Sequence, residues 1–366
     1  MNRLMCIAGG GTGGHVMPAL ALADVVRQDV PDVDVTFIGA TRGLEATLLP
    51  ERGEDVLLLD MHAVQGVGIM QRVKVLLWEL PKSVLRIRKA WKNNRKPDVL
   101  VGVGGYASVA GVVAALLSRI PVVLYEQNAI PGLVNRVLHR FCKVMMLGFA
   151  SAEKHLQHQS HKSVVTGNVI RADVLQTVYK THEKPCLLIV GGSQGAMFLN
   201  DTVPRACQNL ARQGKDFRVI HLVGAGDGRV QDVQAMYAKV NIEADVQSFS
   251  HDMPNMFAQA SLMVARAGAM TVCEAGAVGM PALFVPLPWA ADNHQYFNAL
   301  SMKEAGAADI VLQKTCDVAK LTQKLSRLLF NPVVLQAMSD AGVKQTIRDA
   351  GARQVKVLQP LLEAHA

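Results

Sequence analysis

Two glycine-rich segments of this chain have the composition of anion-binding loops. Residues 9–15 read Gly-Gly-Gly-Thr-Gly-Gly-His and residues 191–195 read Gly-Gly-Ser-Gln-Gly, and each follows a short apolar run. A strand, a glycine turn and a helix point backbone N–H groups and the positive end of the helix dipole at the turn. Glycine lets the backbone approach a phosphate closely. Two such loops, far apart in the chain, indicate two nucleotide-type α/β domains.

The first loop fits the pattern G-x-G-x-x-G through Gly9, Gly11 and Gly14. A dinucleotide-binding loop also requires an acidic residue about 20 residues further on, at the end of the second strand, to hold the ribose. Here the second apolar run ends at Ile38, and two small residues without an acid follow. The sequence therefore disfavours NAD and leaves a general phosphate loop, with a tight structural turn as the alternative.

Two polar positions beside predicted strand ends are candidates for acid–base chemistry. His15 lies near the start of a predicted helix, where the helix dipole disfavours the imidazolium form and leaves the ring able to accept a proton. A structural hydrogen bond is its alternative role. Glu126 follows the apolar run 122–125, at the edge of the sheet where ligands bind in open α/β folds. For Glu126 and its neighbours Gln127 and Asn128, the alternative is loop capping.

The segment 266–276 is the most distinctive motif of the second half. It reads as a loop that leads into a helix, with Thr271 and Glu274 at the spacing of a capping box. That box alone would account for both residues. The functional alternative is that Glu274 accepts hydrogen bonds from two vicinal ribose hydroxyls. Further on, the polar cluster 292–296 suits either contacts with sugar hydroxyls or the solvated start of a helix.

The composition excludes several classes of protein. With 366 residues, 50% of them hydrophobic, the chain is long enough for two domains with large cores. Its 6 cysteines show no metal-ligand spacing, which is typical of a reduced cytosolic protein. The longest apolar stretch, 109–117, is too short to span a bilayer, and the N-terminus leads into a glycine loop rather than a signal peptide. We therefore expect a protein that is soluble or lies on a membrane surface.

One short segment carries the whole charge imbalance of the chain. The net charge is +8, and the basic segment, residues 69–96, holds 9 Lys and Arg against 1 acid, which is 9 − 1 = +8. Pro81 divides it into two helical stretches, and a kink there would blur their relative phase. The stripe predicted to face the core consists of Val73, Leu77, Leu80, Val84 and Trp91. Val75, Trp78 and Leu85 are predicted on another side, among Lys74, Lys82, Arg86 and Lys89, while the side of Ile69 is not assigned.

Apolar and aromatic residues among cations are typical of a surface that docks on an anionic membrane. A solvated helix face and a nucleic-acid contact are the alternatives for this segment. No recognised nucleic-acid motif accompanies the charge, so we expect no nucleic-acid partner.

Strand-like apolar runs alternate with helical patterns, which predicts parallel, doubly wound sheets with right-handed crossovers. The first series of strands is expected at 4–8, 33–38, 99–103, 121–125, 144–147 and 164–165. The second series is expected at 186–190, 217–223, 246–249, 262–265 and 282–285. The pattern breaks after the first series, so we predict domains at 1–165 and 166–349, with a helix at about 350–366 that packs back on the first domain.

In combination these motifs resemble the MurG family, the bacterial transferases that add N-acetylglucosamine to lipid I. The motifs that carry the resemblance are GGGTGGH at 9–15, GGY at 104–106, EQN at 126–128, GGSQGA at 191–196, RAGAMTVCEAG at 266–276 and NHQYFNA at 293–299. They span nearly the whole chain. The resemblance implies the GT-B fold, in which two Rossmann-like domains face a cleft: an N-terminal domain for the acceptor and the membrane, and a C-terminal domain for the UDP-sugar.

The resemblance also implies a reaction. N-acetylglucosamine would pass from UDP-N-acetylglucosamine to the muramyl sugar of undecaprenyl-diphosphate-linked lipid I, giving β-1,4-linked lipid II with inversion. This would occur at the cytoplasmic face of the inner membrane, without a metal or other cofactor. His15 is our first candidate for the general base and Glu126 the second. The first glycine loop would face a diphosphate, that of the acceptor.

The residues implied by the resemblance form two sets. The donor contacts would come from Thr12, Gly13, Gly14, Asn128, Arg171, Ser193, Ser250, Ala269, Met270, Thr271, Val272, Cys273, Glu274 and Gln295. Arg171 and the helix after the second loop would stabilise the donor diphosphate. The membrane contacts would come from Ile69, Val75, Trp78, Lys82, Leu85, Arg86 and Lys89.

Some positions depart from the family's usual pattern. A proline is common where Val169 stands, and Val109-Ala110 replaces a usual Gly-Pro. An apolar residue is frequent where Ser250 stands, so a contact with uracil there would be made through the backbone. Tyr125 replaces a common histidine, so that ring is not required for proton transfer.

Other functions stay open at this point. An NAD(P)-dependent oxidoreductase would need the ribose partner that the second strand lacks. A nucleic-acid binder would use the basic segment and leave the Glu274 motif unexplained. A related glycosyltransferase with a soluble acceptor could be distinguished only by an acceptor assay.

Overall fold

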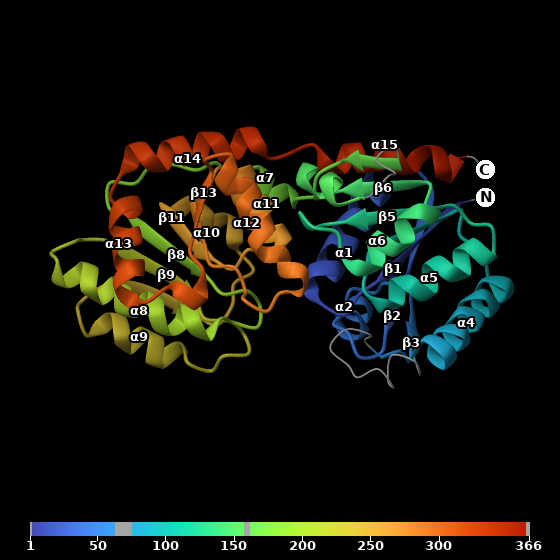
Figure 1. Ribbon diagram of the computed structural model, residues 1–366, viewed down its shortest axis with the longest axis horizontal. Helices are drawn as coiled ribbons and strands as arrows, with labels where there is room; N and C mark the ends of the chain where they lie inside the picture. Colours follow the sequence, from blue (N-terminus) through green and yellow to red (C-terminus); the bar gives the residue numbers. More distant parts are fainter. Residues whose placement is uncertain (1, 63–74, 157–161, 364–366) are drawn as a thin grey trace. The chain divides into compact units, whose positions relative to one another are not determined.

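The computed structural model describes residues 2–62, 75–156 and 162–363. These residues form two compact units (Figure 1). The first unit comprises Met1–Val169 together with Asp349–Ala366, and the second comprises Ile170–Arg348. Each unit is built on one parallel β-sheet, as the alternating sequence pattern predicts.

The sheet of the first unit has 7 strands, in the order β3-β2-β1-β4-β5-β6-β7. They are β1 (Arg3–Gly9), β2 (Val33–Ala40), β3 (Val56–Leu59), β4 (Val99–Gly104), β5 (Val122–Glu126), β6 (Val144–Leu147) and β7 (Ser163–Val165). Every residue of β4 is buried, because both faces of a parallel sheet are covered. Alternate residues of β1 enter two different cores: Cys6 and Ala8 one, Met5 and Ile7 the other.

Helices cover both faces of this sheet. They are α1 (Gly13–Asp29), α2 (Glu45–Glu51), the π-helical turn η1 (Val75–Glu79), α4 (Leu80–Asn93), α5 (Tyr106–Leu117), α6 (Leu133–Leu138) and α15 (Ala350–Glu363), with 3-10 turns at His139–Phe141 and Ala150–His155. On one face, Ile87 and Trp91 of α4 belong to the same core as Ala110 of α5. On the other face, Leu20 of α1 and Leu358 of α15 share a core with β1.

The sheet of the second unit has 6 strands, in the order β10-β9-β8-β11-β12-β13. They are β8 (Cys186–Val190), β9 (Arg218–Leu222), β10 (Glu243–Gln247), β11 (Leu262–Ala265), β12 (Ala282–Phe284) and β13 (Ala308–Ile310). The helices of this unit are α7 (Ala172–Leu175), α8 (Met197–Arg212), α9 (Val230–Ala238), α10 (Met253–Gln259), α11 (Ala269–Val278), α12 (His294–Glu304), α13 (Val318–Leu329) and α14 (Pro332–Gln345), with 3-10 turns at Ala291–Asn293 and Gln313–Thr315.

Both sheets reverse their strand order beside the strand that precedes a glycine loop. β1 lies between β2 and β4, and β8 lies between β9 and β11. Ligands of open α/β sheets bind at the carboxyl ends of the strands at such a switch point. The fold therefore places residues 9–15 and 191–195 at the ligand-binding edge of their own sheets.

The sheet edges differ from the sequence prediction. The short strands β3 and β13 are not predicted, and β10 begins at Glu243 rather than at Val246. Edge strands have fewer covered neighbours, and the residues of β10 are all partly or fully exposed. β10 therefore lacks the continuous apolar run by which the central strands are recognised, whereas β3 has such a run, Val-Leu-Leu-Leu, over only 4 residues.

The two units divide the sequence after Val169, whereas the sequence predicts a boundary after Val165. The difference arises because the intervening residues bond to the first unit. Gln354 of α15 donates a hydrogen bond to the Gly167 carbonyl at 2.8 Å, and the Tyr125 hydroxyl donates to Asn168 Oδ1 at 2.8 Å. The glycine–asparagine break in the pattern is therefore part of the first unit.

The last helix, α15, packs on the first unit beside α1 (Figure 1). Leu358 is 0% exposed in the core that α15 shares with α1 and β1. An ion pair between Arg3 and Glu363, 3.8 Å apart, joins the first strand to the end of this helix. The first unit therefore depends on a segment from the other end of the chain.

Leu358→Ala should lower the free energy of unfolding of the first unit by about 2–5 kcal/mol, because it opens a cavity in that core. Hydrogen exchange of the amides in α1 and β1 measures this loss. The matched control is Gln359→Ala on the exposed side of the same helix, which should change the value by less than about 0.5 kcal/mol. Faster exchange confined to the second unit would contradict the assignment of α15.

Candidate active site

The first glycine loop leads from β1 into α1 without a side-chain cap. Thr12 stands at the N-cap position, but its side chain makes no capping hydrogen bond. Gly13 and Gly14 are the first helical residues, whose N–H groups find no acceptor inside a helix. The start of α1 therefore keeps the property that the sequence predicts, an N-terminus suited to an anion.

The earlier part of the loop is used by the protein itself. The Gly11 N–H donates to Glu45 Oε2 at 2.7 Å, and the Gly10 N–H donates to the Gly104 carbonyl at 3.4 Å. An anion at this loop would therefore be bound by the amides at the start of α1, because the Gly10 and Gly11 N–H groups already have acceptors. Glu45 has no role in the sequence prediction.

His15 lies in the first turn of α1, and Gln127 sets the orientation of its ring. His15 Nδ1 lies 3.3 Å from Gln127 Oε1, while Gln127 Nε2 donates to the Tyr125 carbonyl at 3.1 Å. Because the Gln127 NH2 group is used on that carbonyl, its oxygen faces the histidine and accepts from Nδ1–H. The neutral ring then carries its lone pair on Nε2, the nitrogen that can take a proton.

Gln127 is 0% exposed, and the sequence prediction does not include it as a site residue. Its position after β5, between Glu126 and Asn128, was the only signal. The segment is anchored further by the buried Tyr125, whose hydroxyl bonds to Asn168, and by Asn168 Nδ2, which donates to the Gln127 carbonyl at 2.9 Å. The tyrosine at the position of the family's common histidine is therefore a structural residue.

Glu126 is buried at the end of β5 with both oxygens bonded. Oε1 accepts from the Asn128 backbone N–H at 3.0 Å and from its side-chain amide at 3.1 Å. Oε2 accepts from the Gly132 N–H at 2.9 Å and from Asn135 Nδ2 at 2.9 Å. This geometry matches the loop-capping alternative, and of the two candidate bases it favours His15.

In the second unit, α11 begins at the carboxyl end of β11 without a side-chain cap. Its N-cap residue is Gly268, and Thr271 lies inside the first turn. The capping box, one of the two alternatives for Thr271 and Glu274, is therefore wrong, because the helix begins at Ala269, before the position that the box requires. Glu274 does not cap α11, and the first amides of this helix have no intrahelical acceptors.

Glu274 lies in the second turn of α11 and faces Arg171. Arg171 Nε lies 3.7 Å from Glu274 Oε1, and Arg171 Nη1 lies 3.7 Å from Asp173 Oδ2. Burial raises the pKa of Glu274 to about 7, although the nearby Arg171 charge lowers it. The structure thus brings together two residues that the resemblance assigns to the same ligand.

The second glycine loop is held by close backbone packing. A Cβ on Gly224, whose φ is +108°, would collide with Gly195, whose φ is +79°. The Ala225 N–H donates to the Ser193 carbonyl at 3.0 Å. The Ser193 side chain is exposed just before α8, in a loop whose backbone is held by its contacts with Gly224 and Ala225.

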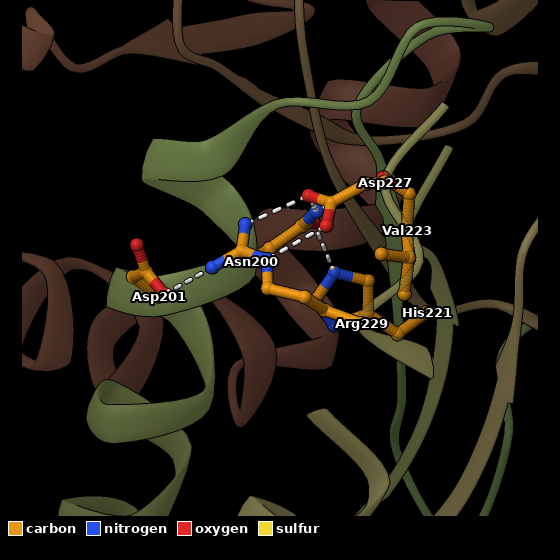
Figure 2. A network of polar contacts seen from close by, with 6 residues as sticks. All are labelled: Asn200, Asp201, His221, Val223, Asp227 and Arg229. Carbon is orange, nitrogen blue, oxygen red and sulfur yellow. Dashed lines mark hydrogen bonds and ion pairs between the residues drawn. The ribbon is translucent and has the colours of Figure 1, made fainter. Parts of the chain in front are cut away.

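A buried polar network continues this support (Figure 2). His221 Nε2 lies 3.0 Å from Asn200 Oδ1, and its Nδ1 lies 2.9 Å from the Tyr237 hydroxyl. Asn200 Nδ2 donates to Asp227 Oδ2 at 2.7 Å, and Arg229 holds the pKa of Asp227 below its usual value through hydrogen bonds. Burial lowers the pKa of His221 to about 3, so this ring is neutral and structural.

Ser250 and Gln295 use their side chains on the protein's own backbone. Ser250 Oγ accepts from the Asp252 N–H at 3.0 Å, just before α10. Gln295 Oε1 accepts from the Ala267 N–H at 3.3 Å and from the Leu287 N–H at 3.0 Å, which ties together the loops after β11 and β12. The donor contacts that the resemblance implies for these residues would have to come from the Ser250 backbone and from the Gln295 NH2 group.

The donor contacts implied by the resemblance fall in both units. Thr12, Gly13, Gly14 and Asn128 belong to the first unit, and Arg171, Ser193, Ser250, Ala269, Met270, Thr271, Val272, Cys273, Glu274 and Gln295 belong to the second. Val272 and Cys273 are buried at 0% and 7% exposure, so their contacts with a ligand would be made by the backbone.

The basic segment presents an exposed face on α4. Lys82, Leu85, Arg86 and Lys89 are exposed, whereas Ser83, Val84, Ile87 and Trp91 are buried on the opposite side. Trp78 is 74% exposed, as the sequence predicts. Ile69, Val73 and Lys74 lie outside the described residues.

Two predictions for this segment are wrong. Val75, expected on the exposed side, is 1% exposed and joins the core, while Leu77, expected in the core, is 65% exposed. Residues 75–79 form a π-helical turn, whose i→i+5 bonds shift the faces relative to an α-helix. Pro81 lies in the first turn of α4, where it is tolerated, so no kink is needed to explain the change of phase.

Within residues 2–62, 75–156 and 162–363, no helix combines the length and the apolar content required to cross a membrane. The same residues contain no cluster of three or more His, Cys, Asp or Glu side chains that could hold a metal ion.

The two parallel sheets, each with a glycine loop at its switch point, define a protein of two nucleotide-type α/β units, and comparison with known proteins identifies it as a glycosyltransferase. Residues 5–147 match the N-terminal domain of glycosyltransferase family 28, and residues 186–354 match its C-terminal domain. The chain therefore belongs to the MurG family of glycosyltransferases, as its relatives show.

Three relatives illustrate the match. The chain is 40% identical, over 357 residues, to the UDP-N-acetylglucosamine--N-acetylmuramyl-(pentapeptide) pyrophosphoryl-undecaprenol N-acetylglucosamine transferase of Aeromonas hydrophila, covering 96% of this chain and 95% of that protein. The transferase of the same name from Anaeromyxobacter sp. is 40% identical over 343 residues, covering 92% and 88%. The crystal structure of Acinetobacter baumannii MurG is 31% identical, with a TM-score of 0.82 and coverage of 98% and 100%. These similarities confirm the GT-B fold class.

Proposed function

We propose that this chain transfers N-acetylglucosamine from UDP-N-acetylglucosamine to the muramyl sugar of undecaprenyl-diphosphate-linked lipid I, forming β-1,4-linked lipid II with inversion. The names of its relatives support the donor and the lipid-linked acceptor. The observation that carries the proposal is the Glu274 carboxylate, which lies on α11 and faces Arg171 without taking part in a capping box. Two vicinal ribose hydroxyls would complete the hydrogen bonds of this carboxylate.

The second unit would bind the donor. The Glu274 carboxylate would accept hydrogen bonds from both ribose hydroxyls. Arg171 and the uncapped starts of α8 and α11 would carry the diphosphate charge that develops as UDP leaves, without requiring a metal. Ser193, Ser250 and Gln295 would complete the donor contacts from neighbouring loops.

The first unit would supply the base. The acceptor hydroxyl attacks the anomeric carbon of the donor, the bond to UDP breaks, and one displacement inverts the α-linked sugar. His15 Nε2 would take the proton of the attacking hydroxyl, while Gln127 keeps Nδ1 protonated. Glu126 would hold the loop that carries Asn128 rather than exchange protons.

We also propose that the protein binds peripherally to the cytoplasmic face of the inner membrane. The contact would be made by Trp78, Lys82, Leu85, Arg86 and Lys89, whose side chains are exposed along one side of η1 and α4. Apolar side chains would enter the interface while the cations pair with anionic lipid headgroups.

The transfer itself is tested by turnover of UDP-N-acetylglucosamine with a lipid I analogue. We expect release of UDP and formation of a disaccharide-linked product. Transfer only to soluble sugars would instead support the glycosyltransferase with a soluble acceptor. Calorimetric titration with NADPH should show no binding, and binding of NADPH in place of the UDP-sugar would revive the oxidoreductase hypothesis.

His15→Ala should lower kcat by a factor of about 10² to 10⁴, because the attacking hydroxyl loses its base. Steady-state turnover with saturating donor and acceptor measures the effect. Donor binding, followed separately by calorimetry, should be retained. A fall in kcat of less than a few-fold would rule out His15 as the base.

Donor binding should weaken as the pH falls through the pKa of Glu274. With a pKa of about 7, this carboxyl is mainly ionised at about pH 8 and mainly protonated at about pH 6, so the Kd for UDP-N-acetylglucosamine should rise about tenfold across this range. Calorimetric titration measures it. In Glu274→Gln the Kd should be weak and independent of pH, and a pH dependence that persists in this variant would assign the titration to another group.

Changing Lys82, Arg86 and Lys89 together to glutamate should release the protein from anionic vesicles, because attraction to the headgroups becomes repulsion. Vesicle sedimentation at physiological ionic strength measures this. A control with the same charge change replaces Arg205, Lys239 and Lys344, which are exposed on the second unit, and should still bind. Equal binding by both triple variants would refute the membrane proposal.

A further inference from the structure

Glu45 is a buried carboxylate that joins the first glycine loop to the end of β2. It is 0% exposed. Its Oε1 accepts from the Ala40 N–H at 2.9 Å, and its Oε2 accepts from the Gly11 N–H at 2.7 Å. One side chain therefore bridges the backbones of two separate strand ends in the first unit.

The role of Glu45 in its own helix does not explain these bonds. It is the first residue of α2, and the N-cap residue, Leu44, makes no side-chain cap. The two carboxylate oxygens of Glu45 accept from the Ala40 and Gly11 N–H groups, which both lie outside α2. In the part of the chain that the structure describes, no Lys or Arg lies within ion-pair distance of this carboxylate. Burial of a carboxylate that only N–H groups compensate is a poor source of stability.

The surrounding glycines leave the space that this side chain fills. A Cβ on Gly10, Gly39 or Gly43 would collide with Glu45. These glycines come from the loop after β1, from β2 itself and from the turn before α2. The Glu45 carboxylate is therefore enclosed by the backbone of three segments, and each of them restricts its position.

We propose that Glu45 is a positioning residue for glycosyl transfer. By holding Gly11, it fixes the loop immediately before α1, so that the free amides of Gly13 and Gly14 and the ring of His15 keep one geometry. The inference rests on the proposed role of the first unit in binding the acceptor and supplying the base. It names a residue that acts through the loop and does not itself touch the reacting atoms.

The same carboxylate makes the first loop unsuited to a nucleotide diphosphate. It occupies the Gly11 N–H, and its negative charge lies behind the loop, where it would repel a second anion at that amide. Anions are therefore restricted to the start of α1. This agrees with a donor site in the other unit.

The test is Glu45→Gln, which keeps the length of the side chain but replaces one acceptor oxygen with an NH2 group. That group cannot accept an N–H, so one of the two bridging bonds is lost. We expect kcat to fall about 10-fold to 100-fold through misplacement of the loop. The KM for the donor should rise by less than kcat falls, because most of the donor contacts lie in the second unit. The shape of the pH profile of kcat should stay that of the wild type, because the His15 ring and its Gln127 partner are retained.

The matched control is Asp98→Asn at the opposite end of β1. Asp98 Oδ2 accepts from the Leu4 N–H at 2.7 Å, so this variant disturbs a similar carboxylate–amide bond far from the loop. It should keep kcat within about twofold even if its Tm falls as far as that of Glu45→Gln. All assays are made well below the lowest Tm.

Gly39→Ala gives a second route if Glu45→Gln fails to fold. It keeps the Glu45 carboxylate but displaces the side chain, because the added Cβ collides with it, and it should lower kcat in the same way. A kcat within twofold of the wild type in either folded variant, or an equal loss in Asp98→Asn, would overturn the proposal. The proposed base is tested separately by His15→Ala, so loss of activity there with full activity in Glu45→Gln would reject only this inference.

Discussion

The N–H groups at the starts of four helices are the constraint around which both units are organised. α1 and α5 follow β1 and β4, and α8 and α11 follow β8 and β11; none of these helices has a side-chain cap. Asp252, Asp317 and Asn331 cap α10, α13 and α14, whereas α2, α4, α6, α7, α9 and α12 also begin without a side-chain cap. The position at the switch point of a sheet therefore distinguishes the four helices. Uncapped amides at the switch point of a parallel sheet are unsatisfied until a ligand or water reaches them. The fold thus leaves its bonding capacity where the chemistry would occur.

Such open helix ends require rigid loops, and buried polar side chains provide the rigidity. Glu126 and Glu45 bond to backbone N–H groups in the first unit, and Gln127 links the segment after β5 to His15. In the second unit Asn200 and His221 hold the strand end beside the second glycine loop. Buried polar networks of this kind specify one conformation, although they add little net stability.

Much of this could be predicted from the sequence, because its strongest signals are local. The apolar runs give the central strands, and the position of Glu274 in a glycine-containing loop motif suggests a ligand. The errors fall where local patterns are ambiguous. Val75 and Leu77 exchange faces because a π-helical turn changes the angle per residue, and no hydropathy pattern reports that. The contacts of Glu45 with Gly11 and of Gln127 with His15 join segments far apart in the chain, so no spacing rule could identify them.

The two units differ in where a carboxylate lies relative to the glycine loop. A dinucleotide-binding loop requires an acidic residue after the second strand. The sequence around Ile38 lacks it, yet the structure places a carboxylate close to that strand end, from Glu45. Its direction is reversed: it bonds to the loop N–H instead of facing outward to a ribose. In the second unit, the carboxylate of Glu274 lies on α11, the helix after β11, beside Arg171. Among the described residues it makes no hydrogen bond to the second glycine loop. In the proposed function the two similar sheets take different partners. The Glu45 carboxylate, which occupies the Gly11 N–H of the first loop, would favour this division.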